Sequence, residues 1–215
     1  MPIKKSSLAG AISLAMGTAW SLSLQAQSFP AQINLSDLDG TNGLVLNGEF
    51  AGDSSGRSVS AAGDVNGDGI DDLIIGAYNA GPNGNNFAGR SYVVFGSNAG
   101  LPNPFNLDSL DGMNGFALNG EAPTEFSGVS VSAAGDVNGD GFGDVIIGAD
   151  GATANGIPSV GRSYVVFGAN TVFPSQLDLS ELNLVNGFVL NGEALFDFSG
   201  TSVSNAGDVN GDGIN

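Results

Sequence analysis

Apolar residues along this chain gather in short runs that end at Gly, Asn, Asp or Pro. In the first half of the chain the runs lie at residues 44–46, 58–62, 73–75 and 92–95. A Ser-Val-Ser alternation predicts a strand with one packed and one polar face, whereas the Ile-Ile and Val-Val-Phe runs predict inner strands buried on both faces. Beyond the N-terminal 26 residues, no long segment has the 3.6-residue period of a helix. The pattern therefore predicts an all-β protein of short strands and tight turns.

The whole pattern returns every 72 residues, in units of about 34–105 and 106–177 and a truncated unit at 178–215. Four short strands in each unit, without a helix, are typical of a β-propeller blade. We therefore predict four-stranded blades of an incomplete β-propeller, with two full units and part of a third. The recurring segments are N-G-x-x-L-N-G-E from Asn42, Asn114 and Asn186, S-G-x-S-V-S from Ser55, Ser127 and Ser199, and G-R-S-Y-V-V-F-G at 89–96 and 161–168.

Each unit also carries an acidic loop, D-V-N-G-D-G, which begins at Asp64, Asp136 and Asp208. Oxygen side chains at loop positions one, three and five suit Ca²⁺, which takes several oxygen ligands, and the Gly at position six permits the sharp turn. Carboxylates this close repel one another unless a cation lies between them. The predicted Ca²⁺ ligands are Asp64, Asn66, Asp68, the carbonyl of Ile70 and Asp72 in the first loop, Asp136, Asn138, Asp140, the carbonyl of Phe142 and Asp144 in the second, and Asp208, Asn210 and Asp212 in the third.

Other loops that share these opening letters fit less well. An EF-hand requires Glu at position twelve, where this chain has Ile75 and Ile147. A dockerin-type loop precedes a helix, whereas Asp-Leu-Ile-Ile-Gly-Ala follows here and reads as a strand. A solvated Asp/Asn/Gly turn without metal is the remaining alternative. The regular spacing of the three copies favours the metal site.

The first 26 residues have the layout of a secretory signal peptide. Lys4 and Lys5 precede an apolar run at 8–24, and Leu-Gln-Ala follows. Small and polar residues interrupt the run, so it is a poor membrane span, and a buried N-terminal helix is the alternative. We expect a secreted or cell-surface protein with a repeat region at 27–215. Since the chain has no cysteine, calcium would replace disulfides as its cross-link.

Composition excludes several classes of function. With 22 acidic and 5 basic residues the chain lacks the basic face that nucleic-acid binding needs. It has no His and no Cys, which removes the common nucleophile–base pairs and zinc sites. We therefore predict that this chain is not an enzyme. Acids and arginines that recur in register read as turn, blade-junction or strand-end residues: Glu49, Glu121, Glu193, Arg90 and Arg162. The acids outside the repeat pattern form no recognisable glycosidase pair: Asp53, Glu125, Asp150 and Asp197.

The segments Phe-Ser-Gly from Phe126, Ala-Gly-Asp-Val-Asn-Gly-Asp-Gly from Ala134 and Ile-Gly-Ala from Ile147 resemble the FG-GAP repeat of integrin alpha-chain propellers. Similar repeats occur in phosphatidylinositol-glycan-specific phospholipase D and in many exported bacterial proteins. The resemblance covers nearly all of residues 27–215. It implies calcium loops that join the two innermost strands of a blade and face away from the ligand-binding side. The chain departs from the pattern at Ser54, which replaces the Phe, and at Tyr78 and Asp150, which replace a closing Pro.

By this resemblance we expect an exported calcium-binding propeller that acts in adhesion or extracellular recognition, with a protein or glycan ligand that the sequence does not identify. The alternative is an accessory propeller domain of a larger, phospholipase D-like exported hydrolase. A closed propeller needs about four to eight blades. We therefore expect the chain to be part of a longer protein, with completion by self-association as the alternative.

Overall fold

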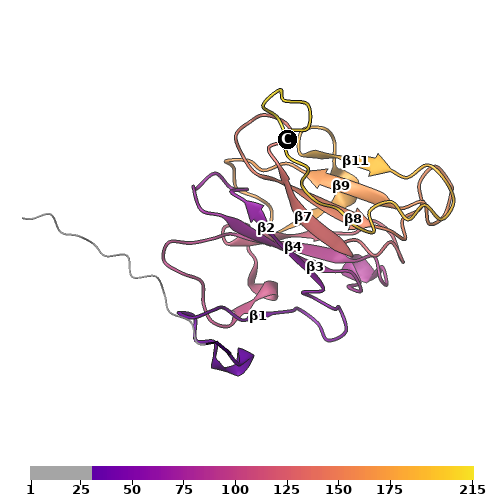
Figure 1. Ribbon diagram of the computed structural model, residues 1–215. Helices are drawn as coiled ribbons and strands as arrows, with labels where there is room; N and C mark the ends of the chain where they lie inside the picture. The colour runs from indigo at the N-terminus through magenta and orange to yellow at the C-terminus, as the bar shows by residue number, and fades with distance from the viewer. Residues whose placement is uncertain (1–30) are drawn as a thin grey trace, which may run out of the picture. The chain divides into compact units, whose positions relative to one another are not determined.

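The computed structural model describes residues 31–215 (Figure 1). The predicted signal peptide at 1–26 therefore lies outside the described residues. One unit of the chain ends at Asp37, and its described part contains a single 3₁₀ helix, η1 (Leu35–Asp37). The second unit begins at Leu38 and contains all strands found between residues 31 and 215. No helix between residues 31 and 215 is long and apolar enough to cross a bilayer.

Two largely antiparallel sheets dominate the second unit, which confirms the all-β prediction (Figure 1). The first sheet has the order β10-β6-β4-β3-β2, and the second has the order β11-β9-β8-β7. The strands of the first sheet are β2 (Ser58–Gly63), β3 (Asp72–Ala77), β4 (Arg90–Val94), β6 (Gly115–Asn119) and β10 (Gln176–Asp178). Those of the second are β7 (Ser130–Gly135), β8 (Asp144–Ala149), β9 (Arg162–Val166) and β11 (Gly187–Asn191). The remaining elements are a parallel pair, β1 (Leu46–Asn47) with β5 (Phe105–Asn106), and three 3₁₀ turns, η2 (Pro82–Gly84), η3 (Leu107–Ser109) and η4 (Leu179–Glu181).

The sheets are offset from the sequence repeat. β2, β3 and β4 come from one unit, but the next strand of their sheet, β6, is the opening segment of the following unit. β10 lies still further along the chain and pairs in parallel with β6, Leu177 beside Leu118. In the second sheet β11 takes the place of β6 and pairs antiparallel with β9. The sets β2, β3, β4, β6 and β7, β8, β9, β11 are therefore each built from two successive sequence units.

The main core lies between the two sheets. Ile74, Val93 and Phe116 from the first sheet join the same buried cluster as Ile147 and Tyr164 from the second. The Ile-Ile and Val-Val-Phe runs of the first unit are buried as expected, because each lies in a central strand with neighbours on both sides. In the second unit Ile146 and Phe167 are half-buried.

The strands that carry the Ser-Val-Ser pattern, β2 and β7, differ in burial. Val131 on β7 is buried against the first sheet, and its amide donates a hydrogen bond to the Ser58 hydroxyl at 2.9 Å. Val59, at the same place on β2, is 62% exposed because no described sheet covers that face. The alternation therefore identifies the strand correctly in both units, while burial depends on the neighbouring sheet.

Two glycines allow the sheets to approach closely. Gly76, in the Ile-Gly-Ala segment of β3, lies against the backbone of Gly128, in the Phe-Ser-Gly segment before β7. A Cβ at Gly76 would lie 2.0 Å from the carbonyl oxygen of Gly128. Gly148 has the same relation to Gly200, with a Cβ-to-oxygen distance of 1.8 Å. The two short motifs that define the repeat thus meet at the junction between successive units.

Candidate metal centres

The first acidic loop connects β2 to β3 at the inner hairpin of the first sheet. A break in the ladder register between Ala61 and Gly63 releases the chain from β2, and Asp72 is the first residue of β3. Within the loop the Asp64 carboxylate accepts three backbone amides, those of Gly67, Asp68 and Gly69, at 2.8, 3.0 and 2.8 Å. These bonds turn the backbone around the Asp64 side chain, as Asx-turn chemistry predicts.

Asp72 is the buried acid of this loop, 1% exposed. Its two oxygens accept the amides of Val65 at 2.9 Å and Gly96 at 2.8 Å, so the carboxylate is fixed by both the loop and the end of the third strand. Burial above all, and then the charges of Asp68 and Asp64, raise the pKa of Asp72 to about 6, although the two amides act in the opposite direction. The three acids of the loop are therefore within electrostatic reach of one another.

Asn66 and Asp68 form the exposed side of the loop. The Asn66 amide donates to Asp68 Oδ2 at 3.1 Å, and the Asp68 amide donates to Asn66 Oδ1 at 2.9 Å. Asp68 Oδ1 accepts the backbone amide of Ile70 at 2.9 Å. Each of these side chains is oriented by the backbone of its own loop.

The second loop repeats this arrangement. The Asp144 oxygens accept the amides of Val137 at 2.7 Å and Gly168 at 2.9 Å. Burial, followed by the charges of Asp140 and Asp136, raises the pKa of Asp144 to about 6. The remaining predicted ligands keep the same bonds: Asp136 to the amides of Asp140 and Gly141, Asn138 to Asp140, and Asp140 to the amide of Phe142.

The third loop has the same local turn without a buried acid. Asp208 accepts the amides of Gly211 and Gly213 at 2.6 and 2.8 Å, and Asn210 donates to Asp212 at 2.8 Å. Asp208 is exposed, and its pKa is lowered, chiefly by the Gly213 amide. The three predicted ligands of this loop are therefore in place as a turn.

The donor set fits a hard cation, with one qualification. All predicted side-chain ligands are oxygen donors, and a buried carboxylate beside two further acids is stabilised by a bound divalent ion. Between residues 31 and 215, however, no three carboxylates are gathered tightly enough to hold a metal by themselves. A Ca²⁺ ion would thus need Asn66 and the Ile70 carbonyl as well as Asp64, Asp68 and Asp72. That requirement matches the predicted ligand list, and Ca²⁺ binding stays a prediction.

The acids and arginines that recur in register form ion pairs away from these loops. Arg90, at the start of β4, pairs with Glu49 through one guanidinium nitrogen, and Arg162 pairs with Glu121 at 2.6 Å. The Tyr92 hydroxyl also donates to Glu49, at 3.1 Å. These contacts agree with the interpretation of both arginines and both glutamates as structural residues.

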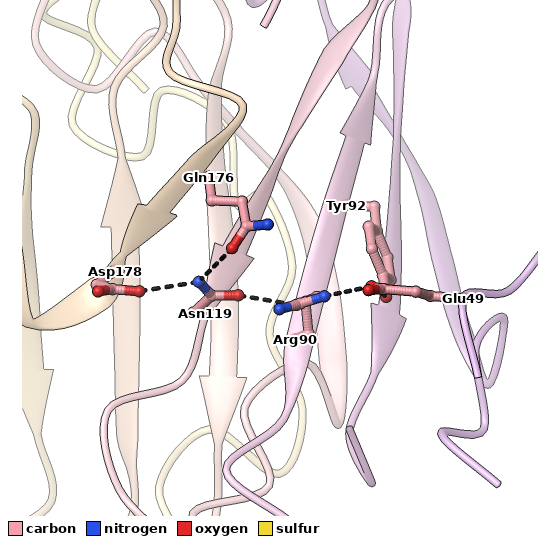
Figure 2. A network of polar contacts seen from close by, with 6 residues as sticks. All are labelled: Glu49, Arg90, Tyr92, Asn119, Gln176 and Asp178. Carbon is pink, nitrogen blue, oxygen red and sulfur yellow. Dashed lines mark hydrogen bonds and ion pairs between the residues drawn. The ribbon is translucent and has the colours of Figure 1, made fainter. Parts of the chain in front are cut away.

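A polar network that the sequence did not suggest extends from this ion pair (Figure 2). The Arg90 Nε donates to Asn119 Oδ1 at 2.8 Å, and the Asn119 amide donates to Asp178 at 2.8 Å and to Gln176 at 3.3 Å. Asn119 ends β6, and the two acceptors lie on β10. The recurrence of Asn at 47, 119 and 191 in the L-N-G-E motif is the signal that could have revealed Asn119.

The second sheet has only part of this network. Asn191, the counterpart of Asn119, is exposed, and in the described chain no strand pairs with the outer edge of β11. Among residues 31–215, Arg162 Nε and the buried Tyr164 hydroxyl find no hydrogen-bond acceptor or donor of good geometry. The hydrogen bonding of Arg162 is thus less complete than that of Arg90 in residues 31–215.

Comparison with known families now fixes the nature of the repeat. The FG-GAP repeat model matches residues 55–94 and 127–166, which span β2 to β4 and β7 to β9 with their acidic loops. The chain carries FG-GAP repeats. These repeats indicate a β-propeller-like fold, in which the strand sets β2, β3, β4, β6 and β7, β8, β9, β11 correspond to blades.

The chain is also similar to curated proteins over part of its length. The chain is 36% identical over 111 residues to a phosphatidylinositol-glycan-specific phospholipase D from Rattus norvegicus, a match that covers 52% of this chain and 13% of the relative. It is also 36% identical over 106 residues to the phosphatidylinositol-glycan-specific phospholipase D of Homo sapiens, covering 49% of this chain and 12% of the relative. The FG-GAP chain thus spans about one eighth of the length of these relatives.

Proposed function

We propose that this chain is a calcium-binding FG-GAP propeller segment of an exported protein, and that it acts in adhesion or extracellular recognition without catalysing a reaction itself. The observation that carries the proposal is the matched pair of buried acids, Asp72 and Asp144. Asp72 begins β3 and Asp144 begins β8. Each accepts a hydrogen bond from one amide of the acidic loop and from one amide just after the next strand, β4 or β9. A cation at either acid would therefore connect three segments of one blade.

When bound, Ca²⁺ would supply positive charge at the loop and neutralise the acids that surround it. The protein's own contribution is orientation, because backbone amides hold Asp64, Asp72 and their counterparts in place before any ion arrives. Binding of a ligand to the folded state alone stabilises that state. The expected role of calcium is therefore to brace the hairpin, with an affinity on the order of 10⁻⁴ to 10⁻³ M, typical of extracellular modules.

Isothermal titration calorimetry with Ca²⁺, combined with metal analysis of the dialysed protein, tests this proposal. We expect at least two equivalents of bound Ca²⁺, one for each loop with a buried acid. Asp72→Asn and Asp144→Asn should each remove about one equivalent, because the side chain keeps its shape and loses its charge. A protein that binds no Ca²⁺ while remaining folded would contradict the proposal.

The second candidate is an accessory propeller domain of an exported hydrolase. Its support is the similarity of this chain to phosphatidylinositol-glycan-specific phospholipases D. The matched stretch covers a small part of each relative, so the proposal for this chain is a non-catalytic domain. Hydrolysis of a glycosylphosphatidylinositol-anchored substrate by the purified chain would overturn that assignment. Calcium-dependent binding to such a substrate without hydrolysis would support the accessory role.

A further inference from the structure

A pocket of about 460 Å³ lies at the ends of the strands that are remote from the acidic loops. Asp72 begins β3, whereas Tyr78 in the pocket wall directly follows the last residue of that strand. Six residues of extended chain separate the two positions, a distance of about 20 Å. The pocket walls include three aromatic rings and three polar side chains: Tyr78, Phe126, Phe198, Thr124, Asp150 and Ser159.

The preceding unit shows why the pocket is open. Equivalent positions in the two units are 72 residues apart. At these positions the first unit has Arg57 where the second has Val129, and Phe87 where the second has Ser159. The Arg57 guanidinium lies 5.3 Å from the Tyr78 ring centre, and the Phe87 ring lies 6.3 Å from that of Phe126. The first unit therefore covers this region with its own side chains. The shorter side chains of the second unit leave the space free.

The acid of the pocket also departs from the repeat. Asp150 replaces Tyr78 of the first unit, and it accepts the Thr201 hydroxyl at a long 3.5 Å. Burial, its largest influence, raises the pKa of Asp150. In residues 31–215 the ion pairs involve Glu49 and Glu121, so no arginine or lysine neutralises this carboxylate. A half-buried carboxylate of this kind gains from hydrogen-bond donors brought by a ligand.

The pocket backbone is held in an uncommon conformation. Thr124, Phe126, Ser159 and Phe198 all have positive φ, at 65°, 57°, 51° and 51°. Such values are costly for residues with a side chain. They recur at the equivalent positions Ser54, Phe87 and Phe196 outside the pocket, so they are a feature of the repeat's turns. Here the backbone amide of Phe126 donates a hydrogen bond to the Phe87 carbonyl at 3.1 Å and fixes the residue in place. The aromatic wall is therefore positioned in advance of any ligand.

We propose that this pocket binds a neutral sugar ring. The flat apolar face of a pyranose can stack on an aromatic ring, while its hydroxyls donate to the Asp150 carboxylate and exchange hydrogen bonds with Thr124 and Ser159. No basic side chain lines the pocket, which disfavours phosphate and acidic sugars. A single guanidinium or ammonium group would leave most of the volume unfilled. The proposal rests on the recognition function proposed above and assigns it a ligand class.

Saturation-transfer NMR and calorimetry on the full chain, with methyl glycosides of galactose, glucose and mannose and with N-acetylglucosamine as probes, test this inference. We expect at least one probe to bind. Ser159→Phe places the side chain of the first unit in the pocket and should abolish binding. Asp150→Asn keeps an acceptor oxygen but removes the charge, and should weaken binding about tenfold. Val185→Phe changes a side chain that is 86% exposed outside the pocket and should have no effect.

The contrary outcomes are distinct. Absence of binding by every probe, or retention of binding in Ser159→Phe, would overturn the sugar site. Binding of agmatine that is lost in Asp150→Asn, with no sugar bound, would show a cation site instead. If Ser159→Phe does not fold, as judged by thermal unfolding, Asp150→Asn decides alone. Ca²⁺ titration of the same samples separates the two proposals, because normal calcium binding without sugar binding contradicts only the sugar site.

Discussion

The backbone carbonyl of Asp64 accepts a hydrogen bond from the amide of Gly143 at 2.8 Å, so the first acidic loop contacts the second directly. The next residue, Val65, accepts the amide of Ala169 at 2.9 Å. Asp136 has the same relation to Asn215, at 3.3 Å. Successive loops are therefore connected through their backbones, and an ion that fixes one loop would also order the contact to its neighbour.

Removal of one loop acid should reduce both calcium stoichiometry and thermal stability. Asp68→Ala and Asp140→Ala should each remove about one equivalent of bound Ca²⁺. At a free Ca²⁺ concentration 100 times the dissociation constant, the lost stabilisation is about 2.7 kcal/mol per site. Calorimetry and the melting temperature with and without chelator measure the two effects. Asp108→Ala, an exposed acid outside the loops, is the matched control and should bind calcium like the wild type.

Gly76→Ala should destabilise the junction between the two sheets. The new Cβ would lie 2.0 Å from the Gly128 carbonyl oxygen, which is backbone and cannot rotate away. Overpacking of this kind costs about 1–3 kcal/mol. Urea unfolding measures the loss. Gly81→Ala is the control, because its nearest neighbour would be 3.5 Å away. Equal stability of the two variants would show that the sheets separate easily at this point.

Asn119→Ala should cost more than Asn191→Ala. Asn119 is 1% exposed and connects Arg90 to Asp178, so its loss leaves buried polar groups unpaired at a cost of about 1–3 kcal/mol. Asn191 is exposed and makes no such link. Chemical unfolding of both variants gives the comparison. A larger effect at Asn191 would contradict the structural role of the network.

Glu125→Gln should change how stability depends on pH. Burial, the main cause, raises the pKa of Glu125 above its ordinary value of 4.5 in the folded protein. The folded state therefore binds more protons than the unfolded state just above pH 4.5, and stability falls as the pH rises through that window. Glutamine carries no charge, so the variant should show a smaller decline, and the part that remains comes from the other buried acids, Asp72 and Asp144.

Thermal unfolding between pH 4 and 8 compares the wild type, Glu125→Gln and the exposed control Glu181→Gln. The control should follow the wild type, because its side chain is exposed. A Glu125→Gln variant with an unchanged pH profile would show that this carboxyl is not desolvated in solution.

The central strands were predictable because their residues satisfy both local propensity and tertiary burial. Ile74 and Val93 are β-branched residues in short runs, and both are fully buried between neighbouring strands. The acidic loops were equally predictable, since Asp, Asn and Gly direct the same turn in all three copies.

The phase of the blade was not predictable from the repeat. A period of 72 residues is unchanged wherever the unit is taken to begin, so the sequence did not show that β6 completes the sheet of the preceding unit. The same reason explains β1, which was predicted within the first unit but pairs only with β5. β10 has no apolar run at all, and it is a strand because β6 and Asn119 offer it partners.

The pocket and the polar network depend on side chains that meet across units. Asp150 stood out from the repeat only as an unpaired acid, and Ser159 gave no signal of its own. Their role in lining the pocket becomes clear when they are compared with Tyr78 and Phe87, whose neighbours in space are known only from the fold. A departure from a repeat thus indicates a candidate site residue, and the structure shows which pocket that residue lines.

The outer strands have a consequence for recombination among such proteins. β6 and β10 join the first sheet from further along the chain, so successive units share strands. Deletion of one unit would therefore remove the outer strands from the sheet of the unit before it. A crossover at residue 105 would place β4 and β6, which are hydrogen-bonded to each other, in segments from different parents. A crossover in the turn between β6 and β7 would keep β2, β3, β4 and β6 together. Chimaeras that fold should therefore have their crossover points in that turn.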